Sequence, residues 1–231
     1  MRAIATVDDE VARRAFGSGR AIAVDASSGW PGAIRGRAWA SLRVFEADLA
    51  SSAIDRQVAV AMYDPEQWVH TPLDEQRDPV SAIRRFVHIA RSHGFVSMVT
   101  PYPRLVTVPG SPHLVRAGEA EEAAYVRSRI AAEAGAADIC ETQAQRRQRD
   151  PDAYREFVSA TARQARDANP DVVVLSGLST SPGYAATPAM LLSAWDCVRD
   201  IVDGHYISLS KGRHVEVMAA FLRATLETNE R

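Results

Sequence analysis

The stretch Ala137-Asp-Ile-Cys-Glu-Thr-Gln-Ala-Gln-Arg-Arg-Gln-Arg-Asp-Pro151 contains the pattern that decides the fold of this chain. Ala137 to Glu141 is a short apolar run ending on a carboxylate, which predicts a buried strand. A polar loop follows, and Asp150-Pro151 then predicts the start of a helix, because aspartate is a good N-cap and proline suits the first helical turn. The stretch is therefore one strand-loop-helix unit.

The same order of elements recurs along the chain. Helix starts are predicted again at Asp78-Pro79 and at Thr187-Pro188. The run Val172 to Ser176 is mostly β-branched, which is typical of a parallel strand that is covered on both faces. After the first strand, a connection through Trp30-Pro31-Gly32 leads to a helix predicted near residues 38–50. The predicted strands are 21–25, 57–63, 95–100, 137–141, 172–176 and 205–209.

Repeated strand-helix units predict an α/β fold with a parallel sheet. We predict a (β/α) TIM-type barrel that is irregular or has fewer than eight clear βα units, because a complete barrel typically needs ~250 residues. An open doubly wound sheet is the alternative. The absence of a glycine-rich loop after the first strand and the polar residues at strand ends favour the barrel. We expect one domain over residues 1–231, with 1–19 as an N-terminal helix or tail.

Composition narrows the range of partners. The chain has 231 residues and a formal net charge of -2, which argues against nucleic-acid binding. No stretch approaches the ~20 apolar residues needed to cross a membrane, and the acidic N-terminal region lacks the apolar run of a signal peptide. We therefore expect a cytoplasmic protein with a small-molecule substrate and no membrane partner. The sequence leaves the oligomeric state open.

Carboxylates occur at several predicted strand ends, where the loops of such folds form active sites. Asp25 ends the first strand, Asp64 and Glu66 follow the second, and Glu141 ends the fourth. Strand alternation lets Asp25 and Glu141 face each other across the barrel mouth. Neighbouring carboxylates in a partly apolar cavity have separated pKa values, as general acid and base roles require. The alternative is that Asp25 caps a loop and Glu141 pairs with an arginine.

The loop Asp64-Pro-Glu-Gln-Trp-Val-His70 is the richest in reactive side chains. Tryptophan beside acids suits a sugar ring, which stacks on indole while its hydroxyls bond to carboxylates. Trp30 occupies a similar place after the first strand. A β-turn with Trp68 packed under the next helix is the alternative. The full set of predicted substrate-binding residues is Trp30, Trp68, His70, Tyr102, Gln143, Ser176, Tyr206 and Ser208.

Three further features remain open at the level of sequence. We expect no cofactor, with Mg²⁺ on Asp25, Asp64 and Glu141 as the alternative. The chain contains no CxxC, HExxH, P-loop, GxGxxG or GxSxG motif, which argues against zinc hydrolases, nucleotide-binding enzymes and serine hydrolases. The basic cluster is either a solvated approach to a helix or a site for an anionic substrate group. It consists of Arg146, Arg147 and Arg149.

Lys211 is the only lysine of the chain, and it follows the sixth predicted strand. Lysine can lose its proton or form an imine, whereas arginine cannot. Lys211 is therefore a candidate catalytic residue at the same rim as the carboxylates. Strand alternation, however, places it on the face opposite Ser208 and Ser210. The alternative is a solvated lysine in a loop.

Acids at the ends of the first, second and fourth strands, with tryptophans near the mouth, resemble the glycoside-hydrolase-like (β/α) barrel superfamily. The resemblance is at the level of the fold and rests on no motif. It implies an enzyme that uses strand-end carboxylates for acid/base chemistry on a polar, carbohydrate-like small molecule. Glu141 would be the general acid, Asp25 or Asp64 the base or nucleophile, and the tryptophans the sugar platform.

The sequence departs from that superfamily at one point, since no second glutamate stands at a late strand end. Two other functions therefore stay open. One is a lyase, isomerase or aldolase-like enzyme that uses Lys211 and Glu141. The other is a barrel that binds a ligand without catalysis.

Overall fold

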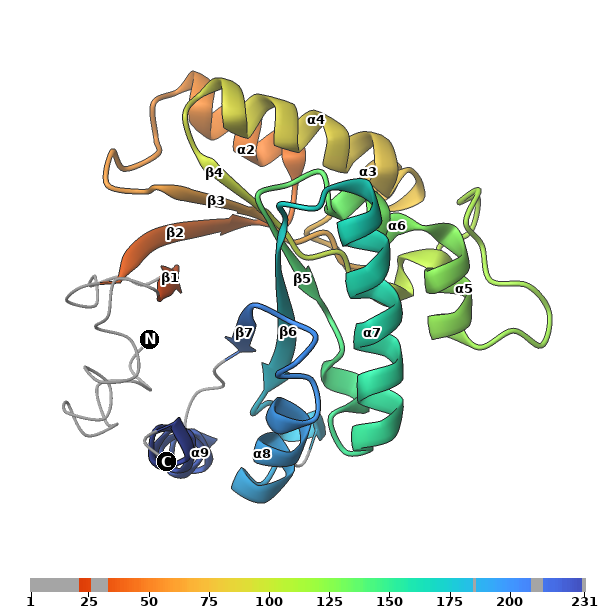
Figure 1. Cartoon of the computed structure of the whole chain (residues 1–231). Helices are drawn as coiled ribbons and strands as arrows, with labels where there is room; N and C mark the ends of the chain where they lie inside the picture. Colours follow the sequence, from red (N-terminus) through yellow and green to blue (C-terminus); the bar gives the residue numbers. More distant parts are fainter. Residues whose placement is uncertain (1–20, 26–32, 185, 209–213, 230–231) are drawn as a thin grey trace.

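The computed structural model describes residues 21–25, 33–184, 186–208 and 214–229. These residues form an α/β fold built on a seven-stranded parallel sheet with its strands in sequence order. The sheet curls into a half-barrel, an irregular TIM-type barrel, as the sequence predicted. Its edge strands β1 and β7 lie on the same side of the molecule (Figure 1). The strands are β1 (Ile22–Val24), β2 (Ile34–Trp39), β3 (Val60–Tyr63), β4 (Val96–Val99), β5 (Ile139–Thr142), β6 (Val173–Ser179) and β7 (Gly204–Ser208).

The predicted helix near residues 38–50 is wrong in its first part, because β2 precedes the helix α2 (Leu42–Ala50). The strand pattern of Ile34-Arg-Gly-Arg-Ala-Trp39 is weak because two inward residues, Gly36 and Ala38, are small and the outward Arg37 is charged. Inside, a Cβ on Gly36 would lie 3.2 Å from Ile22 Cγ2. Outside, Arg37 and the indole of Trp39 both donate to Asp48 of α2, at 2.5 and 2.8 Å. Hydrophobic periodicity is a poor guide to such a strand.

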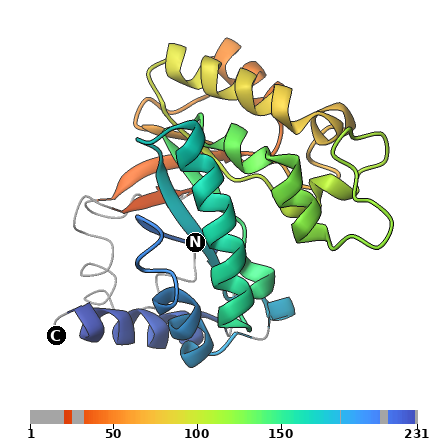
Figure 2. The same cartoon turned by 45° about the vertical axis from the view of Figure 1, so that its right-hand side comes forward.

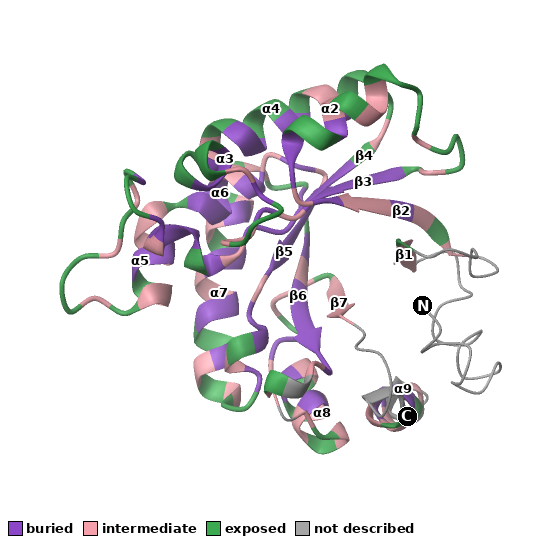
Figure 3. Ribbon diagram, turned by 180° about the vertical axis from the view of Figure 1, so that it is seen from behind, coloured by how far each residue is buried: buried purple, intermediate pink, exposed green. Residues whose placement is uncertain are grey.

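The helices cover the outer side of the curled sheet, and their buried faces point toward it (Figures 2 and 3). The predicted aspartate and threonine caps are confirmed: Asp78, Asp150 and Thr187 each accept a backbone N–H of the first turn. The helices that follow α2 are α3 (Leu73–Arg77), α4 (Pro79–Ser92), α5 (Glu121–Ser128), α6 (Ile130–Ala134), α7 (Pro151–Ala168), α8 (Pro188–Asp196) and α9 (His214–Asn229). Short 3-10 turns occur at η2 (Pro103–Thr107), η3 (Gln145–Arg147) and η4 (Pro182–Tyr184).

Two apolar clusters lie on opposite sides of the sheet. The larger one is between strands and helices, where Phe45, Tyr63 and Phe86 pack with ring centroids 5.0 to 5.2 Å apart. The smaller one lines the concave face and includes Met62 and Met98. Aromatic packing and burial on the outer side stabilise the fold. The inner face consequently keeps space for polar side chains at the carboxyl ends of its strands.

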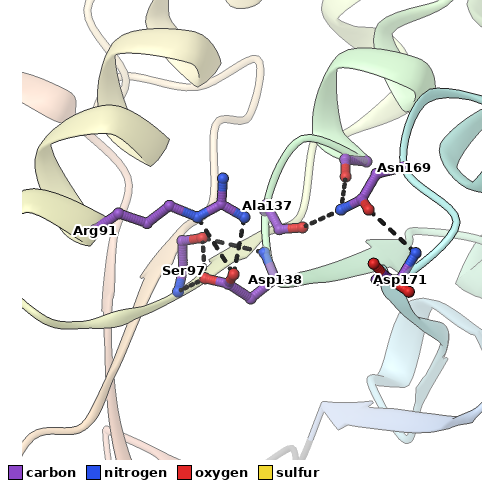
Figure 4. A network of polar contacts seen from close by, with 7 residues as sticks. Arg91, Ser97, Ala137, Asp138, Asn169 and Asp171 are labelled. Atoms are coloured by element: carbon purple, nitrogen blue, oxygen red, sulfur yellow. Dashed lines mark hydrogen bonds and ion pairs between the residues drawn. The ribbon is translucent and has the colours of Figure 1, made fainter.

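A network of polar contacts connects the amino-terminal ends of β4 and β5 (Figure 4). The Asp138 carboxylate accepts from the backbone N–H and the hydroxyl of Ser97, at 2.8 and 2.6 Å, and from Arg91 at 2.8 Å. Nearby, the Asn169 amide donates to the Gly135 carbonyl at 3.0 Å. These contacts lie at the end of the sheet opposite the predicted active site, where polar residues of such folds support stability.

Some predictions fall outside the described residues. They concern residues 1–19 as an N-terminal helix or tail, Trp30 and Lys211. In the described part of the chain, no helix is both long enough and apolar enough to span a bilayer.

Candidate functional site

Asp64 stands directly after β3 on the concave face, and two neighbouring strands supply its partners. The Thr100 hydroxyl, after β4, donates to Asp64 Oδ1 at 2.7 Å. The Gln143 side-chain amide, after β5, donates to the same oxygen at 2.9 Å and to the Thr100 carbonyl at 2.6 Å. Both donors reach Oδ1, so among the described residues Oδ2 receives no hydrogen bond. The arrangement fixes the orientation of the carboxylate through one of its oxygens.

Glu66 lies two residues further along the same loop. Its backbone N–H donates to the Thr71 hydroxyl at 3.1 Å, which also accepts from the Trp68 indole at 3.1 Å. No described residue donates to the Glu66 carboxylate. Trp68 is 43% exposed and its ring packs edge-on against His70 at 4.8 Å. The loop thus presents an acid beside an exposed indole, rather than an indole packed under the next helix.

Glu141 is the most buried acid of the group, with an exposed fraction of 2%. It points to the concave side from β5 and accepts one hydrogen bond, from the Gln145 amide at 2.9 Å. Gly177 of β6 makes room for this pair: a Cβ there would lie 2.1 Å from Glu141 Oε1 and 2.4 Å from Gln145 Nε2. A glycine in a strand interior often marks such a close approach.

The three carboxyl groups affect one another through burial and like charge. Burial, opposed by the Thr100 and Gln143 hydrogen bonds, raises the pKa of Asp64 to about 6. Burial and the Asp64 charge raise the pKa of Glu66 to about 7. The pKa of Glu141 is raised well above its usual range, first by burial and then by the charges of Asp64 and Glu66. Acids held close together without a cation cannot all ionise, so near neutral pH they hold protons and charge in different places.

Tyr206 and Asp25 border the three acids. Tyr206 projects inward from β7 and packs with the smaller apolar cluster. Its pKa is raised first by burial and then by the charges of Glu141 and Asp64. Asp25 follows β1 with a φ of 54° and accepts the backbone N–H of Ala38 at 3.1 Å. Its charge adds to the raised pKa of Asp64. Asp25 is exposed. The charges that raise the pKa of Glu141 are those of Asp64 and Glu66, and not that of Asp25.

The remaining predicted residues divide between the site and other places. Tyr102 is partly buried beside the acids, and Ser208 shares the inner side of β7 with Tyr206. Ser176 lies on the helix-covered side instead, where its hydroxyl contacts His205 Nδ1 at 2.8 Å, so it is not brought to the acids. Lys211, outside the described residues, stays a prediction.

No three His, Cys, Asp or Glu side chains of the described residues converge as a metal ion requires. Asp25, Asp64 and Glu141, which the sequence offered as Mg²⁺ ligands, do not form such a group. A shallow groove over α4 also lies outside the site. Its arginines Arg84 and Arg91 are already paired with acids, at 2.7 and 2.8 Å.

No family model matches the chain, and neither does a curated protein. Among solved structures, the fold is similar to that of a candidate alpha-L-fucosidase from Bacteroides thetaiotaomicron, with a TM-score of 0.51 and 10% sequence identity. The similarity covers 82% of this chain and 62% of that one, so this chain spans less than two thirds of its length. A likeness at this identity shows the fold alone. The resemblance to glycoside-hydrolase-like barrels holds at that level.

The sequence reasoning missed several residues of the site: Thr100, Gln145, Gly177 and Tyr184. A glycine inside a strand suggests close approach of another group, but Gly177 falls just after the predicted strand 172–176, whereas β6 continues to Ser179. Thr100 follows its strand as Asp64 does, so the strand-end rule applied to it equally. Gln145 lies in a 3-10 turn, and Tyr184 ends another one, where side-chain direction cannot be inferred from alternation.

Proposed function

We propose that this protein is an enzyme that uses Asp64, Glu66 and Glu141 for acid/base chemistry on a polar small molecule. The observation that supports this most directly is the convergence of three carboxyl groups with raised pKa values at the carboxyl ends of β3 and β5. Such groups cost stability, since each is short of donors or of a cation. Acids with separated pKa values in a concave site are typical of catalysis.

The pKa values suggest a division of roles. Between about pH 6 and about pH 7, Asp64 is largely ionised while Glu66 keeps its proton. Asp64 is then the base or nucleophile, and Glu66 is the general acid that contacts the substrate. The resemblance to glycoside-hydrolase-like barrels assigned the acid role to Glu141. Its exposure of 2% instead favours a positioning role, as a protonated group behind Asp64.

A glycoside is the substrate class that we propose within this chemistry. Trp68 is exposed beside Glu66 and offers an aromatic face on which a sugar ring can stack. The solved structure with a similar fold is a candidate alpha-L-fucosidase. Because Trp30 lies outside the described residues, the platform rests on Trp68. A cytoplasmic location stays a prediction from sequence.

The test is hydrolysis of a panel of 4-nitrophenyl glycosides, α-L-fucoside included, by the whole chain and its variants. Asp64→Asn and Glu66→Gln should each lower kcat/KM by about 10²- to 10⁴-fold. Glu141→Gln should have a much smaller effect, because glutamine replaces a carboxyl that is already neutral. The control is Asp74→Asn, an exposed carboxylate paired with Arg43, which should leave activity unchanged.

The pH profile separates the roles further. Activity should rise with pH near pH 6, because Asp64 ionises there. It should fall near pH 7, because Glu66 loses its proton there. If Glu141→Gln is as damaging as Glu66→Gln, Glu141 is the acid and the assignment above is wrong. If no glycoside in the panel is hydrolysed, the glycoside proposal fails.

A further inference from the structure

Three successive 3-10 turns form part of the rim next to the acids. The turns η2, η3 and η4 follow the neighbouring strands β4, β5 and β6, so their side chains meet at one edge of the site. Arg104 comes from η2 and Arg146 from η3. Arg149 Nε donates to the Tyr184 carbonyl at 2.7 Å and thereby holds η4 in place.

The charges at this rim do not balance. Glu121, the first residue of α5, contacts both Arg146 Nη1 at 2.5 Å and Arg104 Nε at 3.6 Å. Within the described ranges, Glu121 is the only carboxylate in an ion pair with either arginine. Among Arg104, Arg146 and Glu121, one positive charge is therefore in excess. Arg147, next in the chain, is balanced instead, since it pairs with Glu122 at 2.7 Å.

Two tyrosines connect the arginines with the acids. Tyr102 precedes η2 and its backbone N–H donates to the Pro65 carbonyl at 3.1 Å, next to Glu66 in the chain. Burial raises the pKa of Tyr102, the charge of Arg146 lowers it and the charge of Glu66 raises it. The same two charges act on the pKa of Tyr184. Both tyrosines therefore lie within electrostatic reach of Arg146 and of Glu66.

We propose that Arg146, assisted by Arg104, binds the carboxylate of an acidic sugar or related hydroxy acid whose hydroxylated part reaches Asp64 and Glu66. Arginine suits this role because its planar fork of N–H donors matches a carboxylate. The structure already shows a carboxylate, that of Glu121, bridging this arginine pair. The proposal rests on the proposed function for the reaction, but binding of the anion is a separate property.

The test uses pairs of monosaccharides that differ at one carbon: D-glucuronate with D-glucose, and D-galacturonate with D-galactose. Each is titrated calorimetrically into the whole chain at low ionic strength. Free monosaccharides have no leaving group, so binding is measured without turnover. In at least one pair the acid should bind about tenfold or more tightly than the neutral sugar. Arg146→Gln should abolish that preference.

Arg147→Gln is the matched control, because it removes a neighbouring paired arginine, and it should keep the preference. Equal affinity within both pairs, or no binding of any of the four sugars, overturns the proposal. So does an equal loss in the Arg146 and Arg147 variants, which would indicate a general effect of surface charge. If the preference holds while Asp64→Asn and Glu66→Gln keep full activity, the acid/base proposal fails and the anion site stands.

Discussion

Glu75 and Glu141 are both buried glutamates, with exposed fractions of 6% and 2%, yet their surroundings differ. Glu75 belongs to α3 and faces the start of α2, on the helix-covered side. It receives hydrogen bonds from four donors: Leu42 N at 2.8 Å, Tyr63 Oη at 2.9 Å, Ser41 Oγ at 3.2 Å and Arg43 N at 3.3 Å. Glu141 receives one, from Gln145, and shares its space with two other acids.

The difference shows that hydrogen-bonding partners, rather than burial, distinguish a structural carboxylate from a reactive one. Donors aimed at a carboxylate stabilise its charge and the segments that supply them. Too few donors and nearby like charges favour the protonated form, which can donate a proton. Glu75 ties α3 to the first turn of α2, whereas Glu141 belongs to a group whose protons can move.

The largest expected effect is on stability, from Glu75→Ala. Loss of this carboxylate leaves buried donors of Tyr63 and Leu42 unpaired, so the free energy of unfolding should fall by about 3 kcal/mol or more. Urea unfolding followed by circular dichroism measures it. The neighbouring exposed carboxylate gives the control, since Asp74→Ala should change stability little. Equal losses in the two variants would contradict the structural role of Glu75.

The next effect concerns the space around Glu141. In Gly177→Ala the added methyl overlaps Glu141 Oε1 and Gln145 Nε2, so the pair must move, at a cost of about 2 kcal/mol in the free energy of unfolding. Activity should fall as well. Gly183→Ala is the control, because nothing lies within 4 Å of the added atom. A stable Gly177→Ala variant with full activity would show that the Glu141–Gln145 contact is dispensable.

Ser41→Ala tests one part of the Glu75 site. Ser41 Oγ donates to Glu75 at 3.2 Å and accepts the Val44 N–H at 3.4 Å as the N-cap of α2. Loss of the cap should lower the free energy of unfolding by about 1 kcal/mol. The same denaturation experiment measures it. A loss as large as that of Glu75→Ala would mean that Ser41, and not the full set of donors, holds the carboxylate.

Glu141→Gln should have the smallest effect on stability at pH 5, within about 1 kcal/mol, since it replaces a protonated carboxyl by a neutral isostere. Its effect should instead depend on pH. Asp64, Glu66 and Glu141 have raised pKa values in the folded state, so these three groups bind more protons in the folded protein than in the unfolded chain above about pH 4. Their contribution to wild-type stability should therefore decline as the pH rises from about 4 through 7.

The variant should show a shallower decline, because one of the three proton-binding groups is gone. Thermal unfolding at a series of pH values measures both slopes. Parallel slopes in wild type and Glu141→Gln would contradict a raised pKa of Glu141.

Much of the fold could be predicted from the sequence, because its signals are local. The helix starts at Asp78, Asp150 and Thr187 depend on caps and prolines within one turn. The parallel strands depend on short apolar runs. β2 was missed for a physical reason, since two of its inward residues are small and its outward arginine, Arg37, finds its partner on a helix formed later in the chain.

The candidate site could be predicted only as a set of strand ends. Asp64, Glu66, Glu141, Gln143 and Tyr206 do meet on the concave side, as strand alternation implies. The same rule failed for Ser176, which points outward to His205. Turn residues such as Tyr184 have no alternation from which to infer direction.

The sequence by itself determined that this chain forms parallel strand-helix units and that acids stand at the carboxyl ends of β3 and β5, because periodicity, caps and strand ends are properties of neighbouring residues. Only the tertiary structure decided which acids are paired and which are short of partners. Gln143 and Asp64 are 79 residues apart in the chain and 2.9 Å apart in space. A pKa depends on such distant neighbours and on burial, so the chemistry of these carboxyl groups follows from the folded arrangement.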